Sequence, residues 1–368
     1  MTTSTSLVNA LEALWGIESR LRDVETLPEC ELYRPRDFIV IEPRIDRRQG
    51  SWALFLARKE GIDTITLISR AKKLLGAKRA TIQGLKDACS VSYQYVAFDT
   101  VSMEKRGYGS VIQGKGFKLF YLGTNIPLKP GGLPYNIFHL RVSTSSPGTL
   151  CDNAYKTSQI PGYYGPQRFG IERPNTHIIS LFAGEGSPGY LLKEYSYRYP
   201  LEKRDRPGSY ESRILSQTLK KLNPFKAARV MKVVSQALQS YLFNRALSVA
   251  LSEGTLEAYS EATVTASCRG VRARVPAARL PSPRLEASRS RWARLVAQIL
   301  EEEGISWETL RYSRPVLRPL KYPLCVHSCR AFKNTAVLTL TLPKGAYATI
   351  ALREMCRVNW RECSKNQS

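Results

Sequence analysis

The sequence has few histidines and no glycine-rich phosphate loop, and both absences limit the chemistry that it can support. His139, His177 and His327 are its only histidines, and none lies in the spacing of a nucleophile elbow or a metal-binding helix. Because no P-loop or dinucleotide-binding fingerprint is present, nucleotide hydrolysis and NAD chemistry lack support. Proton transfer must therefore rely on carboxylates or on water.

Long apolar runs and paired cysteines are also missing. No stretch has the apolar length of a membrane span, and the first residues lack the basic start and apolar run of an export signal, so we expect a cytoplasmic protein without a membrane partner. The eight cysteines are scattered singly, and we expect reduced, buried thiols. A zinc site at Cys325, His327, Cys329, Cys356 and Cys363 stays an alternative, although tetrahedral sites usually have tighter, paired spacings.

Positive charge is what the sequence has in excess. Its 55 Lys and Arg residues stand against 31 Asp and Glu, which leaves a net charge of +24 at pH 7. Such a surface attracts polyanions, and contacts to phosphates release condensed counterions. Nucleic acid is therefore the leading partner. An anionic membrane surface, ribosome association and a basic bias of the source organism are the alternatives.

One stretch concentrates this charge. Residues 269–294 carry eight arginines and a single acid, Glu286. The arginines are Arg269, Arg272, Arg274, Arg279, Arg284, Arg289, Arg291 and Arg294. The stretch is either a solvated, flexible face or a surface that follows a phosphate backbone.

Hydrophobic periodicity predicts a mixture of helices and strands, in a chain long enough for two domains or for one domain with an insertion. Helices are expected at residues 6–22, 63–75 and 233–251. Strands are expected at residues 37–42, 52–58, 80–83, 92–98, 118–122, 136–142 and 335–341. We expect residues 37–42 and 52–58 to form a hairpin, residues 161–169 to form turns, and residues 348–358 to form a strand or a helix.

One carboxylate has an unusual setting. The segment Gln83–Asp87 (QGLKD) places an acid in a tight glycine turn between two β-rich segments and beside a lysine. A loop carboxylate next to a cation stays ionised and can be held rigidly by the flanking strands. Asp87 is therefore either a catalytic carboxylate or an ordinary turn residue that caps the next segment.

Six short blocks, in order along the chain, resemble the motifs of one family. They are Arg36–Glu42 (RDFIVIE), Gly84–Gln94 (GLKDACSVSYQ), Asn136–Phe138 (NIF), Gly162–Gly170 (GYYGPQRFG), Gln239–Asn244 (QSYLFN) and Leu342–Thr349 (LPKGAYAT). Together they resemble the signature of the TruD family of tRNA pseudouridine synthases. A basic RNA-binding or ribosome-associated protein without enzymatic ancestry would not carry these blocks in this order.

The resemblance implies an α+β fold. It comprises a pseudouridine synthase catalytic domain, with a mostly antiparallel bent sheet and flanking helices, and an inserted α/β domain of TruD type. The implied boundaries are 1–160 and 320–368 for the discontinuous catalytic domain and 161–319 for the insertion. The implied reaction isomerises uridine, at position 13 by family precedent, to pseudouridine in tRNA. It needs no cofactor or metal, and the sequence does not predict an oligomeric state.

The resemblance also implies roles for seven residues. Asp87 is the catalytic carboxylate, as nucleophile or as base, and Lys86 lies beside it. An aromatic ring must stack on the flipped base, and the candidates are Phe138 and Phe38, which could also be sheet core. Asn136 hydrogen-bonds near Asp87 or the base edge. In the later block, Gln167 and Arg168 contact the substrate or act as structural ties.

The sequence departs from the family at two positions. Leu32 stands where the family usually has a lysine, and Tyr135 stands where glycine usually precedes the asparagine. The first change removes a cation expected near Asp87, for which Arg34, Arg36 or Lys86 could substitute. A catalytically impaired relative that binds or remodels tRNA is therefore the second functional hypothesis.

Overall fold

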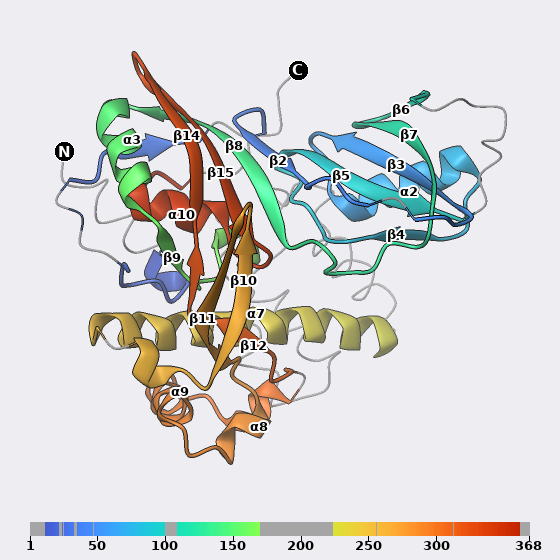
Figure 1. Ribbon diagram of the computed structural model, residues 1–368. Helices are drawn as coiled ribbons and strands as arrows, with labels where there is room; N and C mark the ends of the chain where they lie inside the picture. Colours follow the sequence, from blue (N-terminus) through green and yellow to red (C-terminus); the bar gives the residue numbers. More distant parts are fainter. Residues whose placement is uncertain are drawn as a thin grey trace, which may run out of the picture. The chain divides into compact units, whose positions relative to one another are not determined.

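The protein divides into two compact units in a computed structural model (Figure 1). The described residues are 12–21, 24, 26–32, 35–46, 48–99, 109–169, 224–254, 256–311 and 313–360, without the side chains of 224–235. The first unit takes its described residues from Met1–Leu21, Pro161–Val264 and Val275–Lys321; the second takes them from Arg22–Ile160, Thr265–Arg274 and Tyr322–Ser368. The implied domain boundaries differ from these units at residues 12–21, 265–274 and 320–321, and as domain boundaries they stay a prediction.

The second unit is built on an 11-stranded sheet. Its main path runs β14 (Cys325–Phe332), β15 (Thr335–Pro343), β8 (Tyr135–Thr144), β2 (Phe38–Ile41), β5 (Val91–Phe98), β3 (Trp52–Lys59), β7 (Phe117–Asn125) and β6 (Val111–Gly114). Beside this path lie β1 (Glu29–Glu31), β4 (Ala80–Ile82) and β16 (Arg357–Val358). Pairing is antiparallel except between β2 and β5 and between β1 and β16. The expected α+β fold with a mostly antiparallel sheet is confirmed.

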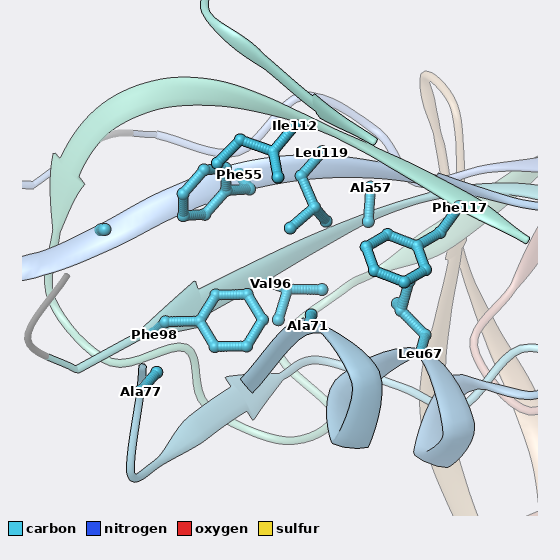
Figure 2. Packing of buried hydrophobic residues seen from close by; sticks show 11 residues of the cluster. Phe55, Ala57, Leu67, Ala71, Ala77, Val96, Phe98, Ile112, Phe117 and Leu119 are labelled. Carbon is cyan, nitrogen blue, oxygen red and sulfur yellow. The ribbon is translucent and has the colours of Figure 1, made fainter. Parts of the chain in front are cut away.

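The helix α2 (Thr64–Leu75) forms where the sequence predicts it. Asp63 caps its start, since its Oδ1 accepts a hydrogen bond from the amide of Thr66 at 2.8 Å, and Gly76 ends it with a φ of 67°. Its apolar stripe covers one face of β3, β5, β6 and β7, where aromatic and aliphatic side chains interlock (Figure 2). Burying each large side chain in such a cluster contributes roughly 1.5–3 kcal/mol, so α2 fixes this half of the sheet.

Two further helices belong to the second unit. The helix α3 (Pro147–Lys156) follows β8, and α10 (Ala348–Met355) follows β15. All eight residues of α10 are buried, and the segment 348–358, for which the sequence allowed a strand or a helix, is helical up to Met355 and ends in the short strand β16. Within the described part of the chain, no helix has both the length and the apolar character needed to cross a bilayer.

The first unit is dominated by α7 (Pro224–Ser252), which contains the helix expected at 233–251. Its apolar stripe is core, because Leu238, Leu242 and Ala246 are fully buried. The ring of Phe243 packs against that of Trp292 in α9 (Arg291–Glu302) at a centroid distance of 5.3 Å. The smaller helical elements are α8 (Pro283–Glu286), η1 (Pro166–Arg168), η2 (Leu256–Tyr259) and η3 (Trp307–Leu310).

Residues 262–279 form a hairpin, and the chain passes between the units within it. Strand β10 (Ala262–Cys268) pairs with β11 (Val271–Arg279), and β11 pairs with β12 (Leu317–Pro319). A separate two-stranded sheet joins β9 (Gln159–Pro161) to β13 (Lys321–Pro323).

Two expectations about local structure were wrong. Residues 37–42 and 52–58 do not form a hairpin, because β5 lies between β2 and β3 and pairs with both. The first helix does not reach Arg22. Of its described residues only 12–14 are helical, and Gly16 then takes a φ of 70°, a conformation that ends a helix.

The expectation of reduced cysteines was also wrong. Three disulfides join Cys30 to Cys356, Cys151 to Cys329 and Cys268 to Cys325, all within the second unit. These bonds use three of the four cysteines of the alternative zinc site; the fourth, Cys363, lies outside the described residues. No cluster of three metal-binding side chains occurs in the described residues.

Candidate active site

Asp87 lies in the loop between β4 and β5 of the second unit, with its carboxylate exposed and its backbone held. The side-chain Oδ1 accepts a hydrogen bond from the amide of Cys89 at 3.0 Å, which closes a local turn. The Ser90 hydroxyl donates to the Asp87 carbonyl at 2.9 Å and lies 2.7 Å from the Ser92 hydroxyl, which is buried in the sheet. The loop therefore presents an ionisable group to solvent from a fixed backbone.

Lys86 points to a different acid. Its ammonium contacts Glu42 Oε1 at 2.7 Å, and the two side chains are only 8% and 0% exposed. The other oxygen of Glu42 accepts from the amide of Tyr95 at 2.7 Å. Burial raises the pKa of Glu42, although the charge and hydrogen bond of Lys86 oppose this shift. Lys86 therefore neutralises a buried carboxylate, and its charge is committed to Glu42.

We expect Lys86→Met to lower the free energy of unfolding by about 3–5 kcal/mol at pH 7.5, since it leaves Glu42 buried and unpaired. Burial raises the pKa of Glu42 in the folded protein above its ordinary value of 4.5. As the pH rises above 4.5, the unfolded chain loses this proton before the folded protein does, so the free energy of unfolding falls. The deficit of the variant should therefore shrink at pH 5. Urea unfolding at both pH values measures it.

The double variant Glu42→Gln with Lys86→Met is the control for this experiment. It removes the buried charge altogether, and much of the lost stability should return. A single variant as stable as the parent at pH 7.5 would show that the pair does not hold the loop.

Phe38 and Phe138 are both buried, at 6% and 7% exposure. Their rings meet edge to face, with centroids 5.9 Å apart and an interplanar angle of 75°. This packing is typical of a sheet core, and it supports the alternative that the two rings are core residues. Stacking on a base stays a prediction for Phe138 and for Phe38.

The strand pairing puts Phe138 on the same face of the sheet as Ser92 and Lys59, two residues close to the Asp87 loop. Phe138 pairs with Val40, and Val40 pairs in turn with Ser92. Ser92 then pairs with Lys59. Side chains of paired residues point to one face, and neighbouring strands lie about 4.8 Å apart, so Phe138 is roughly 10 Å from Ser92.

Asn136 begins the same strand as Phe138 and carries an unsatisfied polar atom. Its Oδ1 is buried without a hydrogen-bond partner in the described structure, as are Gln83 Oε1 and Gln94 Nε2. Buried polar atoms in folded proteins are nearly always paired, so each such atom needs an explanation. An acceptor left open at Asn136 is compatible with its expected hydrogen bond to a substrate, which stays a prediction.

Gln167 and Arg168 belong to the first unit, in the short helix η1. Gln167 is exposed. Arg168 donates from Nε to the Ser240 hydroxyl at 3.0 Å and from its terminal nitrogen to the Gln236 carbonyl at 3.2 Å. Arg168 therefore ties η1 to α7, in line with the structural alternative, and substrate contact stays a prediction for both residues.

Of the three cations expected to replace the family lysine, the two that the structure describes have ion-pair partners other than Asp87. Arg36 pairs with Glu60 at 3.5 Å, Lys86 pairs with Glu42, and Arg34 lies outside the described residues. The residue that the sequence reasoning missed is Lys59, whose ammonium donates to the Asp87 carbonyl at 2.6 Å. The sequence does contain an indication that Lys59 is buried. Alternate residues of a strand point to the same face, and Lys59 follows the buried Ala53, Phe55 and Ala57 in this alternation along β3.

Comparison with known proteins finds a family that this chain resembles. Residues 32–198 match the family described as tRNA pseudouridine synthase D (TruD). Two similar relatives, each named "Probable tRNA pseudouridine synthase D", come from Pyrococcus furiosus and Methanopyrus kandleri. The first is 26% identical, over 88% of this chain and 94% of its own; the second is 29% identical, over 89% and 90%.

A solved structure gives the same indication for the fold. The crystal structure described as that of a TruD protein from Methanosarcina mazei superposes with a TM-score of 0.63 at 22% identity. The superposition covers 95% of this chain and 98% of that one. The ordered motifs and the matches over nearly the whole chain make this chain similar to the TruD family of tRNA pseudouridine synthases, and the shared fold agrees with that similarity.

Proposed function

We propose that this protein isomerises uridine to pseudouridine in tRNA, with position 13 as its target and Asp87 as its catalytic carboxylate. The observation that carries the proposal is the setting of Asp87. It is an exposed carboxylate on a loop bonded to buried Ser90 and Lys59, inside the block that resembles the family signature. The names of its relatives support the same activity.

The reaction is an isomerisation, so its atoms balance within the substrate. The bond from ribose C1′ to uracil N1 breaks, the base rotates, and C1′ bonds to C5, whose proton is lost while N1 gains one. Asp87 acts on the sugar as nucleophile or as base, and either role requires its ionised form. The target base must first leave the RNA stack, at a cost of a few kcal/mol. Phe138, Phe38 and Asn136 are the residues that we expect to receive it.

The test is to map pseudouridine in unmodified tRNA transcripts after incubation with the purified protein. A transcript with cytidine in place of uridine-13 is the matched control. Modification at position 13, and its loss in the control, is the expected result. Modification of another uridine would keep the activity and overturn the assigned position.

One observation keeps a second function in view. Leu32 occupies the place of the usual family lysine, so a catalytically impaired relative that binds or remodels tRNA is the alternative. The same assay separates the two, because a wild-type protein that binds several transcripts and modifies none would favour it. A cytoplasmic location and catalysis without metal or cofactor stay predictions.

For tRNA binding we propose the turn end of the β10–β11 hairpin. Arg269, Arg272 and Arg274 are exposed there, whereas Arg279 and Arg291 further along are paired with Glu261 and Glu253 at 2.7 Å. The arginine-rich stretch is therefore folded, and these three side chains belong to the second unit, as Asp87 does.

Changing Arg269, Arg272 and Arg274 together to glutamine should weaken tRNA binding and flatten its salt dependence. Each lost phosphate contact lowers the slope of log affinity against log salt by about 0.7–0.9. Fluorescence anisotropy at several salt concentrations measures the slope. A triple change of Lys72 and Lys73, in the last turn of α2, and Lys78, just after it, removes the same charge elsewhere. If both triple variants flatten the slope equally, the hairpin is not a specific binding surface.

A further inference from the structure

Lys59 is a fully buried lysine at the end of β3, beside the loop that carries Asp87. Its ammonium donates to the carbonyl of Asp87 at 2.6 Å and to the carbonyl of Ile62 at 3.0 Å. Ile62 leads into Asp63, the residue that caps α2. One cation therefore joins the Asp87 loop to the start of the helix that covers the sheet.

The charge of Lys59 is held in an environment that disfavours it. Burial lowers its pKa to about 8, from an ordinary value of 10.5. The carboxylates of Asp87 and Asp63 and the thiol of Cys89 favour the charged form, and the neighbouring ammonium of Lys86 disfavours it. The Asp87 carboxylate thus interacts with Lys59 through charge, in addition to the hydrogen bond that its carbonyl accepts.

A cation in this position is costly if its only task is to bind carbonyls. Taking an ammonium out of water costs several kcal/mol, and an apolar residue with adjusted neighbours often packs as well. The other charged groups nearby have partners of their own, since Lys86 pairs with Glu42 and Arg58 with Glu60.

We infer that Lys59 is the positioning residue of the active site: its ammonium fixes the Asp87 loop and places a positive charge beside the Asp87 carboxylate. It supplies from β3 the positive charge that the family lysine would supply at Leu32. The inference rests on the proposed function, because it assigns Lys59 a task only through a catalytic Asp87.

The first test compares Lys59→Met with Lys118→Met in steady-state kinetic assays on tRNA. Lys118 is exposed on β7 and pairs with β3 at the neighbouring position, which makes it a matched control. A displaced reacting group costs roughly 10- to 100-fold in rate. We expect Lys59→Met to lose that factor in kcat with little change in KM, and Lys118→Met to keep the parent rate.

The pH profile is the readout that a purely structural role would not change. Above about pH 8 Lys59 loses its proton in the folded protein, whereas the unfolded chain keeps it up to the ordinary value of 10.5, so stability rises with pH in this interval. We expect kcat to fall over the same interval. Lys59→Arg keeps its charge and should not show this decline, whereas titration of the uracil would affect both proteins.

The outcomes separate the two proposals. If Asp87→Asn is inactive while Lys59→Met has the parent kcat, the inference about Lys59 is wrong and the proposed function stands. If Asp87→Asn is active, the catalytic assignment fails first. Should Lys59→Met not fold, the pH profile decides: a decline in the parent alone supports the inference, and a level parent profile, or the same decline in Lys59→Arg, overturns it.

Discussion

Asp87→Asn should abolish pseudouridine formation, with a loss on the order of 10⁴-fold or more, as expected when a group essential to covalent chemistry is removed. Asparagine keeps the size of the side chain and an oxygen that can accept the hydrogen bond from the amide of Cys89. The carbonyl bonded by Lys59 and Ser90 is unchanged. Folding and tRNA affinity should therefore stay close to those of the parent.

The measurement is pseudouridine formed per enzyme under single-turnover conditions, beside thermal unfolding and tRNA binding of the same preparations. Asp152→Asn is a suitable control, because Asp152 is an exposed aspartate on α3 of the same unit. If Asp87→Asn modified tRNA at a rate comparable with that of Asp152→Asn, the active site would lie elsewhere.

Reduction of the three disulfides should give the largest change in stability. Each native disulfide contributes about 2–5 kcal/mol by restricting the unfolded chain, and longer closed loops contribute more in the chain-entropy account. The bonds span sequence separations of 326, 178 and 57 residues. We expect a reductant to lower the midpoint of thermal unfolding strongly, and the second unit to unfold before the first.

Paired Cys→Ser variants resolve the separate contributions. Removing Cys30 and Cys356 should cost more than removing Cys268 and Cys325, because the first bond closes the longer loop. Cys89→Ser changes a cysteine outside the three disulfides and controls for the substitution itself. An unfolding midpoint that does not respond to reductant would contradict a stabilising role for these bonds.

The sequence predicts elements of this fold far better than it predicts their neighbours. Periodicity and capping residues located α2, β5 and the core stripe of α7, because those signals are local. The pairing of β2 and β3 was wrong because β5, nearly 40 positions after β3 begins, inserts between them. The prediction of reduced cysteines failed for a related reason. The fold brings together cysteines that are distant in sequence, and their spacing along the chain does not indicate which of them become neighbours.

The candidate site shows the same division. Asp87 could be proposed because its motif is contiguous, and Asn136 and Phe138 because they form a second short block. The partner of Lys86 could not be proposed, since Glu42 is brought to it by the parallel pairing of β2 with β5. The burial of Lys59 could have been predicted from its place in the alternation of β3. In a chain with 55 Lys and Arg residues, however, a single lysine does not stand out in the sequence.

The bond between Cys30 and Cys356 also changes how the chain would respond to a pulling force. It lies between β1 and β16, which pair in parallel near opposite ends of the described chain. Tension applied at the two termini would pass through this covalent link, and the 325 residues between the two cysteines would carry no load. A molecular motor that threads proteins from one end would meet a closed ring, so the oxidised protein would resist mechanical unfolding until the bond is reduced.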